Sequence, residues 1–184
     1  LPEVSTLEQV EVFKGSAAML YGNVSGGAVV NLVTKRPKFE NGGEISLRGG
    51  SYNSYKPIGD IYGPITKDLA FRLIGTFENN GSYRHNVKSD KYYINPSLLY
   101  QLGEKTDILL QGDYLNYNLT PDFGIGSLDG KIPSNISRSS FFNTPWAFNK
   151  ASQTTVSATV DHQINKSWKL NVIGSYQVFN RNYY

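Results

Sequence analysis

The chain contains no cysteine, a single methionine and only two tryptophans among its 184 residues. The absence of cysteine excludes a disulfide framework, but it fits either the cytosol or a cell envelope and so decides little about compartment. No segment approaches the ~20 consecutive apolar residues that a membrane helix needs. The net charge of +3 is too small and too dispersed to indicate a nucleic-acid partner.

The start of the chain also lacks a targeting signal, because Leu1–Glu3 has neither the basic start nor the apolar run of a signal peptide. Either the N-terminus is mature or the chain is a piece of a longer protein. Residues Gln177 to Tyr184 follow a strand pattern with nothing after it to close the strand. We therefore expect a piece of a longer protein.

Tyrosine, phenylalanine and glycine are abundant, at 13, 9 and 18 residues. Together with many Asn and Ser residues, they suit tight turns and alternating strands better than helices. The negative mean hydropathy would suggest a soluble protein. That inference is unsafe, because a membrane β-strand needs only ~10 residues with every second one apolar.

The first 40 residues differ in character from the rest. Two strands, at residues 7–13 and 29–34, flank small residues at 15–20 that predict a short turn of helix. Gly26 and Gly27 permit a backbone path closed to other residues. The pattern predicts a compact piece ahead of a long run of strands.

After this piece, seven strands are predicted from period-two alternation of apolar and polar residues. Short polar turns follow the second, fourth and sixth strands, whereas longer loops at 81–90 and 119–151 follow the third and fifth. Outer-membrane barrels alternate in this way, with short periplasmic turns and long external loops. The predicted strands are residues 44–52, 55–65, 69–80, 92–102, 107–118, 154–163 and the stretch from Trp168.

The strand faces favour a wide barrel over a small one. Aromatic residues gather at strand ends, where rings can lie at the level of lipid headgroups. Charges on the polar faces would be prohibitively desolvated inside a small sealed barrel but are acceptable in a wet or plugged lumen. The aromatic residues are Tyr52, Tyr55, Tyr62, Tyr92, Tyr93, Tyr114, Tyr117, Trp168, Tyr183 and Tyr184. The polar-face residues are Arg48, Asp60, Arg72, Glu78, Gln111, Asp113, Lys169 and Asn171.

Residues 7–37, LEQVEVFKGSAAMLYGNVSGGAVVNLVTKRP, resemble the end of the plug domain of TonB-dependent outer-membrane receptors. The NLVTKRP ending is similar to the siderophore-receptor branch, of which the ferrichrome-type receptors are part, and Asp60 with Gly63-Pro64 resembles the second barrel strand. Order and spacing agree through about residue 180. The matching plug residues are Glu11, Lys14, Gly15, Tyr21, Gly22, Gly27, Asn31, Thr34 and Lys35. The departures are Ser16 in place of Pro, and Val24 and Ala28 in place of Gly.

The resemblance implies an all-β fold with a small α+β plug piece, present here as an internal fragment. The fragment would be a partial transmembrane antiparallel β-barrel of about seven of 22 strands. Residues 1–40 are expected to be the C-terminal part of the plug and residues 41–184 the first barrel strands. The whole receptor is expected to lie in the outer membrane of a Gram-negative bacterium, to bind a ferric siderophore and to import it actively. Its expected partners are the siderophore, outer-membrane lipid, and TonB, which would be reached through an N-terminal segment that this fragment lacks.

The loop at 119–151 is the best ligand candidate, because long loops of this kind are usually either functional or disordered. Its rings suit flat chelates and apolar siderophore surface, with Arg138 or Lys131 available to an anionic complex. Packing of the same rings against neighbouring loops explains them equally well. The predicted ligand contacts are Tyr117, Phe123, Trp146 and Phe141.

Within the resemblance, plug cations are expected to meet carboxylates on the lumen wall, in pairs that loosen during transport. The candidates are Lys35 and Arg36 on the plug, with Glu78 and Asp113 on the wall. A solvated strand end is the simpler explanation of the two cations. No GxGxxG or Walker spacing is present, so the glycines do not indicate a phosphate site. The glycines expected to shape the plug are Gly15, Gly22, Gly26 and Gly27.

The chain shows no pattern typical of a metal site or an enzyme. His85 and His162 lie in different contexts without ligand spacing, so no cofactor is expected and iron would arrive only as chelated cargo. No serine lies in a nucleophile-elbow sequence, and no close carboxylate pair stands out as acid and base. Two other classes stay open: a passive porin or adhesin barrel, and a soluble all-β carbohydrate-binding domain that uses the same loop aromatics.

Overall fold

The computed structural model of the chain describes residues 3–15, 28–127, 129–131 and 133–184. The chain divides into two compact units, residues 1–36 and 37–184. The predicted boundary was residue 40, and the identities of the two units as plug piece and barrel wall stay predictions. No helix among the described residues is long and apolar enough to cross a membrane.

The first unit is an antiparallel hairpin preceded by a turn of 3-10 helix. Val10 pairs with Leu32 and Val12 with Val30 on one face, and Phe13 pairs with Val29 on the other, so both faces carry apolar side chains. The first strand is followed by Gly15, whose φ of +66° lies in the left-handed region that glycine adopts without strain. The predicted helical turn after it falls almost entirely outside the described residues. The elements are η1 (Val4–Thr6), β1 (Leu7–Lys14) and β2 (Ala28–Thr34).

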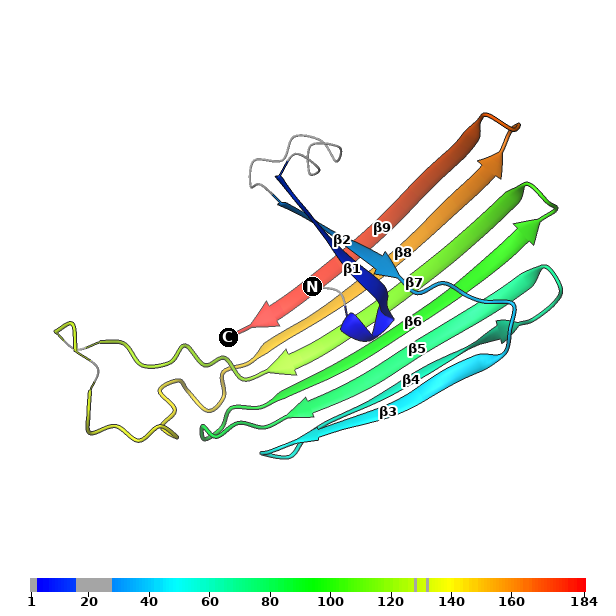
Figure 1. Cartoon of the computed structure of the whole chain (residues 1–184). Coiled ribbons are helices and arrows are strands. Elements are labelled where there is room, and N and C mark those ends of the chain that lie inside the picture. The colour runs from blue at the N-terminus through cyan, green and yellow to red at the C-terminus, as the bar shows by residue number, and fades with distance from the viewer. Residues whose placement is uncertain (1–2, 16–27, 128, 132) are drawn as a thin grey trace. The chain divides into compact units, whose positions relative to one another are not determined.

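The second unit is a single sheet of seven strands in chain order, each antiparallel to its neighbours (Figure 1). The number and order of strands predicted from the alternation are therefore confirmed. The strands are β3 (Gly42–Gly50), β4 (Ser54–Pro64), β5 (Leu69–Asn80), β6 (Ser89–Leu102), β7 (Thr106–Leu119), β8 (Asn149–Gln163) and β9 (Lys169–Tyr183).

From β4 onward, the connections alternate between short and long, as expected, while the connection of β3 to β4 is short. The short connections at one end are residues 65–68, 103–105 and 164–168. The connections at the opposite end are residues 51–53, 81–88 and 120–148 (Figure 1). We refer to this second end as the loop end.

Three strands are longer than predicted: β6 begins at Ser89 rather than Tyr92, β7 gains one residue at each end, and β8 differs most. β8 begins at Asn149 rather than Thr154. Residues 149–153 are mostly polar on both faces, which is typical of a loop, yet each pairs with a residue of β7 up to Leu119. Backbone pairing does not depend on side-chain alternation, so the strand extends beyond the pattern. The long loop is therefore 120–148 rather than 119–151.

The register sorts the side chains of the sheet onto a polar face and an apolar face. All eight residues predicted for the polar faces share one face, which confirms the alternation. The opposite face is apolar, and many of its large side chains are exposed, from 38% at Val178 to 88% at Ile45. An exposed apolar face of this extent is typical of a surface that meets lipid. Its exposed residues include Leu47, Ile61, Leu98, Leu110, Val156 and Val172.

The aromatic residues at the strand ends divide between the two faces. On the apolar face, Phe77 lies 5.7 Å from Tyr55 and 4.7 Å from Tyr92 between ring centroids, so three adjacent strands carry a row of rings near the loop end. An interfacial girdle is possible for rings on this face only. The interpretation is wrong for the tyrosines on the polar face, which are Tyr62, Tyr93, Tyr117 and Tyr183.

A buried ion pair joins β4 and β5 on the polar face. Arg72 donates from Nε to Asp60 Oδ1 at 2.8 Å and from Nη2 to Asp60 Oδ2 at 2.6 Å. Both side chains are about 95% buried, and the Arg72 guanidinium lies 4.7 Å from the centre of the Tyr62 ring. Bidentate geometry of this kind combines charge with directional hydrogen bonds. The pair lies beside Ala70 and Ile74, which are fully buried.

Candidate ligand-binding site at the loop end

Two of the pockets near the loop end of the sheet are lined by Leu119. We name them the Phe123 pocket and the Tyr117 pocket. The Phe123 pocket has a volume of about 380 Å³ and is lined by Leu119, Pro121, Asp122, Phe123, Asn143, Asn149, Arg181, Tyr183 and Tyr184. The Tyr117 pocket has a volume of about 300 Å³ and is lined by Glu78, Asn80, Ser89, Asp90, Lys91, Tyr117 and Leu119.

The Phe123 pocket combines aromatic rings with one guanidinium group. Arg181 donates from Nε to Asn149 Oδ1 at 3.0 Å, and its guanidinium lies 5.0 Å from the centre of the Tyr183 ring. Phe123 is 90% exposed and Tyr183 67% exposed, so these rings offer accessible apolar surface. Rings beside a fixed cation can bind a flat or anionic ligand by apolar burial and charge attraction together.

Strand β9 positions this guanidinium. Arg181 and Tyr183 have the same parity as Lys169 and Asn171, so they point from the polar face of the sheet. β9 pairs with β8 as far as Tyr183, and that pairing brings Arg181 against Asn149 at the start of β8. The rigid part of the site is therefore built on two strand ends, and the loop supplies Phe123.

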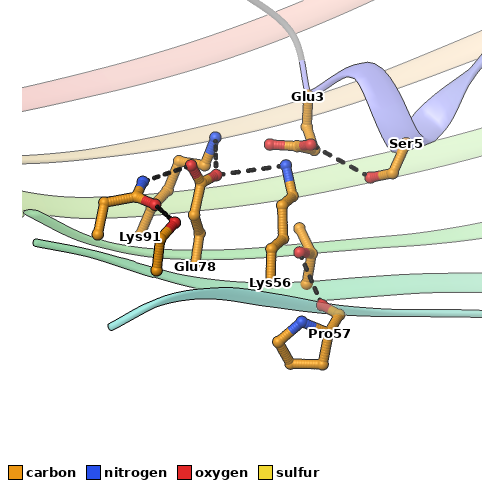
Figure 2. A network of polar contacts seen from close by, with 9 residues as sticks. Glu3, Ser5, Lys56, Pro57, Glu78 and Lys91 are labelled. Carbon is orange, nitrogen blue, oxygen red and sulfur yellow. Dashed lines mark hydrogen bonds and ion pairs between the residues drawn. The ribbon is translucent and has the colours of Figure 1, made fainter. Parts of the chain in front are cut away.

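Lysine and carboxylate side chains meet at the Tyr117 pocket. The Glu78 carboxylate contacts Lys56 at 3.3 Å and Lys91 at 3.0 Å, and it accepts a hydrogen bond from Asn80 at 2.6 Å (Figure 2). The three charged residues come from the adjacent strands β4, β5 and β6. Two ammonium groups face this carboxylate, but Asp90 also lines the pocket, so Lys56 and Lys91 are balanced by Glu78 and Asp90.

The four predicted ligand contacts lie in or after β7, but they do not all line a pocket. Tyr117 and Phe123 line the pockets named after them. Trp146 stacks edge-on against Tyr184 of the Phe123 pocket, at 5.0 Å between ring centroids. Phe141 lines neither pocket. That any of them contacts a ligand stays a prediction.

The predicted plug–wall contacts also stay predictions. Lys35 and Arg36 belong to the first unit, whereas Glu78 and Asp113 lie on the polar face of the second. The Glu78 carboxylate already contacts two lysines of the wall itself. Of the four glycines expected to shape the plug, Gly15 has the left-handed backbone of a turn. The other three, Gly22, Gly26 and Gly27, lie outside the described residues.

Sequence reasoning missed Arg181 as a site residue. The sequence pattern could have found it. The alternation that assigned Lys169 and Asn171 to the polar face also assigns Arg181 to that face, ten residues after Asn171. It also missed Asp122 and Arg84, which contact each other across two loops at 2.9 Å. No local pattern reports that contact.

The two histidines and the carboxylates provide no metal site in the described part of the chain, where no cluster of His, Cys, Asp or Glu could hold an ion. His162 Nδ1 lies 2.8 Å from Thr106 Oγ1 across β7 and β8, an ordinary cross-strand hydrogen bond. The two named pockets at the loop end are lined by rings, amides, carboxylates, and ammonium or guanidinium groups.

No family profile matches the chain. Among curated proteins, it is 29% identical over 179 residues to the metal-pseudopaline receptor CntO of Pseudomonas aeruginosa, covering 96% of this chain and 25% of that protein. It is 31% identical over 175 residues to the ferrioxamine receptor of Yersinia enterocolitica, covering 92% of this chain and 24% of that protein.

Among solved structures, the fold is shared with the ferripyoverdine receptor of the outer membrane of P. aeruginosa, with a TM-score of 0.81 and 24% identity. This match covers 94% of the chain and 24% of that receptor.

These comparisons agree with the strand order and the two-faced sheet. The seven antiparallel strands share the fold of part of the ferripyoverdine receptor, which confirms the expected partial antiparallel β-barrel. The relatives are named as receptors, which confirms the expectation that the chain belongs to a receptor rather than an enzyme. The chain spans about a quarter of the length of the proteins it matches. It belongs with the siderophore receptors of the TonB-dependent family, in the outer membrane of Gram-negative bacteria.

Proposed function

We propose that the protein carrying this chain binds a ferric siderophore at the outer surface and imports it actively, with energy supplied through TonB. The Phe123 pocket carries this proposal, because its exposed rings and the Arg181 guanidinium lie together on the polar face at the loop end. The names of the relatives, which refer to metal-pseudopaline and ferrioxamine, support a metal chelate as the cargo.

Binding at this site requires no covalent chemistry. Burial of an aromatic or apolar chelate surface against Phe123 and Tyr183 supplies affinity, and Arg181 favours complexes with negative charge. The Tyr117 pocket adds no net charge, because Glu78 and Asp90 balance Lys56 and Lys91. Iron enters as chelated cargo, and no resident cofactor is proposed.

Tight capture must be undone before transport, and this step requires work. We assign residues 1–40 to the end of the plug and residues 41–184 to the first strands of the barrel wall. Lys35 and Arg36 are proposed to meet wall carboxylates in contacts that loosen when TonB acts on the plug. Asp113 is the simpler partner, because Glu78 already contacts two lysines of the wall.

The test is uptake of radiolabelled ferric siderophores by iron-starved cells that carry the full-length gene, with and without a proton uncoupler. The panel contains a ferric trihydroxamate, a ferric tricatecholate and ferric citrate. We expect saturable uptake of at least one chelate, abolished by the uncoupler and by deletion of TonB.

Uptake that ignores the uncoupler would instead indicate a passive porin. Absence of uptake for every chelate would contradict the proposed cargo class.

A further inference from the structure

The two longer loops at the loop end are joined by an ion pair. Arg84 of the 81–88 loop donates from Nη1 to Asp122 Oδ1 of the 120–148 loop at 2.9 Å. Both side chains are less than one fifth exposed, at 18% and 19%, although the loops lie at the surface. An ion pair shielded to this degree contributes more than a fully exposed pair.

Backbone hydrogen bonds between the same loops flank the ion pair. The Thr120 amide donates to the Lys88 carbonyl at 2.9 Å, and the His85 amide donates to the Ser139 carbonyl at 3.0 Å. Both limbs of the 120–148 loop are therefore attached to the 81–88 loop. A third contact places the Arg138 guanidinium 5.7 Å from the centre of the Tyr83 ring.

The same carboxylate oxygen shapes the backbone around Phe123. Asp122 Oδ1 also accepts a hydrogen bond from the Gly124 amide at 3.1 Å, which closes a turn with Phe123 at its centre. Gly124 has a φ of +76°, a conformation that favours glycine. Asp122 Oδ1 thus accepts two hydrogen bonds. The one from the Gly124 amide closes the turn, and the one from Arg84 attaches the turn to the 81–88 loop.

We propose that Arg84 is a positioning residue for the Phe123 pocket: through Asp122 it holds the 122–124 turn against the 81–88 loop, and it thereby presents the Phe123 ring to the ligand. Asp122 and Phe123 both line that pocket, whereas Arg84 does not. Arg84 therefore acts on the ligand through Asp122. The ligand part of this inference rests on the proposed function, and the loop attachment does not.

The experiment measures loop attachment and ligand affinity separately in the full-length receptor in detergent. Hydrogen exchange at the Thr120 amide reports attachment, because that amide donates across the two loops. Quenching of intrinsic fluorescence by ferrioxamine or by a ferric tricatecholate reports affinity. The variants are Arg84→Gln, Arg84→Lys and the charge exchange Arg84→Asp with Asp122→Arg.

A matched control is Lys67→Gln. Lys67 forms an ion pair with Asp68 at 3.7 Å in the short connection at the far end of the sheet, and its side chain is 89% exposed. The substitution removes the same kind of charge and leaves the loop end untouched. It should leave both readouts at the wild-type values.

Arg84→Gln should speed exchange at Thr120 about tenfold and weaken chelate binding by about the same factor, as expected for loss of one charge-assisted hydrogen bond. Arg84→Lys should recover most of both losses, because an ammonium group can still contact Asp122. The double variant Arg84→Asp with Asp122→Arg should restore slow hydrogen exchange at the Thr120 amide. It should not restore chelate affinity, because an arginine side chain at position 122 cannot accept the hydrogen bond from the Gly124 amide.

Unchanged exchange at Thr120 in Arg84→Gln would overturn the attachment. Faster exchange with unchanged chelate affinity would overturn the positioning role. A wild-type receptor that binds no chelate would contradict the proposed function together with the positioning role, while exchange at Thr120 still decides the attachment.

Discussion

At the scale of single residues, the buried Asp60–Arg72 ion pair is expected to be the part of the sheet most sensitive to substitution. Replacing Arg72 by Met would leave the Asp60 carboxylate buried without its bidentate partner. Breaking such a pair from one side costs about 3–5 kcal/mol. We expect Arg72→Met to lower the stability of the full-length receptor by this amount, measured by urea unfolding in detergent.

The double variant Asp60→Leu with Arg72→Met supplies the control. Because it removes both charges, it should be more stable than Arg72→Met alone. A double variant that is less stable than the single one would show that the charges, rather than their mutual pairing, are needed at this position.

Phe123 is the single ring on which the proposed site depends most. Phe123→Ala should weaken chelate binding about tenfold, as expected for an aromatic hot-spot side chain. Phe142→Ala is the matched control, because Phe142 is also exposed, at 55%, but does not line the Phe123 pocket. Fluorescence titration of the full-length receptor measures both. Equal losses in the two variants would indicate a general loop effect.

At the scale of the strand, successive residues lie on opposite faces of the sheet, one facing lipid and the other facing the lumen. Leu110 of β7 lies on the apolar face and is 46% exposed, whereas Gln111 lies on the polar face. An arginine on the lipid side near the bilayer midplane costs ~2–4 kcal/mol, and on the lumen side it is tolerated. Leu110→Arg should therefore destabilise the receptor by that amount and Gln111→Arg by far less.

The measurement is equilibrium folding of each full-length variant into lipid vesicles. The two substitutions introduce the same side chain at adjacent positions, so each controls for the other. Similar losses in both variants would contradict the assignment of the apolar face to lipid.

At the scale of the whole molecule, the second unit has an apolar face without a covering layer among the described residues. Ile45, Leu98 and Tyr176 are exposed by 88%, 40% and 72% on that face. Monomeric soluble proteins rarely expose a contiguous apolar patch of this size. The β3 and β9 edges of the sheet add unpaired backbone groups.

The isolated 184-residue chain should therefore need detergent to stay dispersed. Size-exclusion chromatography with and without detergent tests this, and we expect aggregates in plain buffer. A monodisperse monomer in detergent-free buffer would instead favour the soluble carbohydrate-binding class.

The sequence alone determined the features that repeat every two residues. Alternation assigned Arg48, Asp60, Arg72 and Asn171 to one face of seven strands, and the register confirms it. Alternation is readable because each strand residue meets the same solvent as the residue two positions away. The lengths of turns and loops can also be read from the local sequence, because Gly, Asn and Ser mark the places where strands end.

Only the tertiary structure decided the contacts between residues far apart along the chain. Arg84 and Asp122 are separated by 38 positions, and Arg181 and Asn149 by 32. The early start of β8 likewise depends on its partner strand β7 rather than on its own side chains. A charge or an amide carries no local sign of its eventual partner. Its partner depends on which strands are neighbours in the sheet and on the register between them, because these decide which strand ends and loops lie side by side.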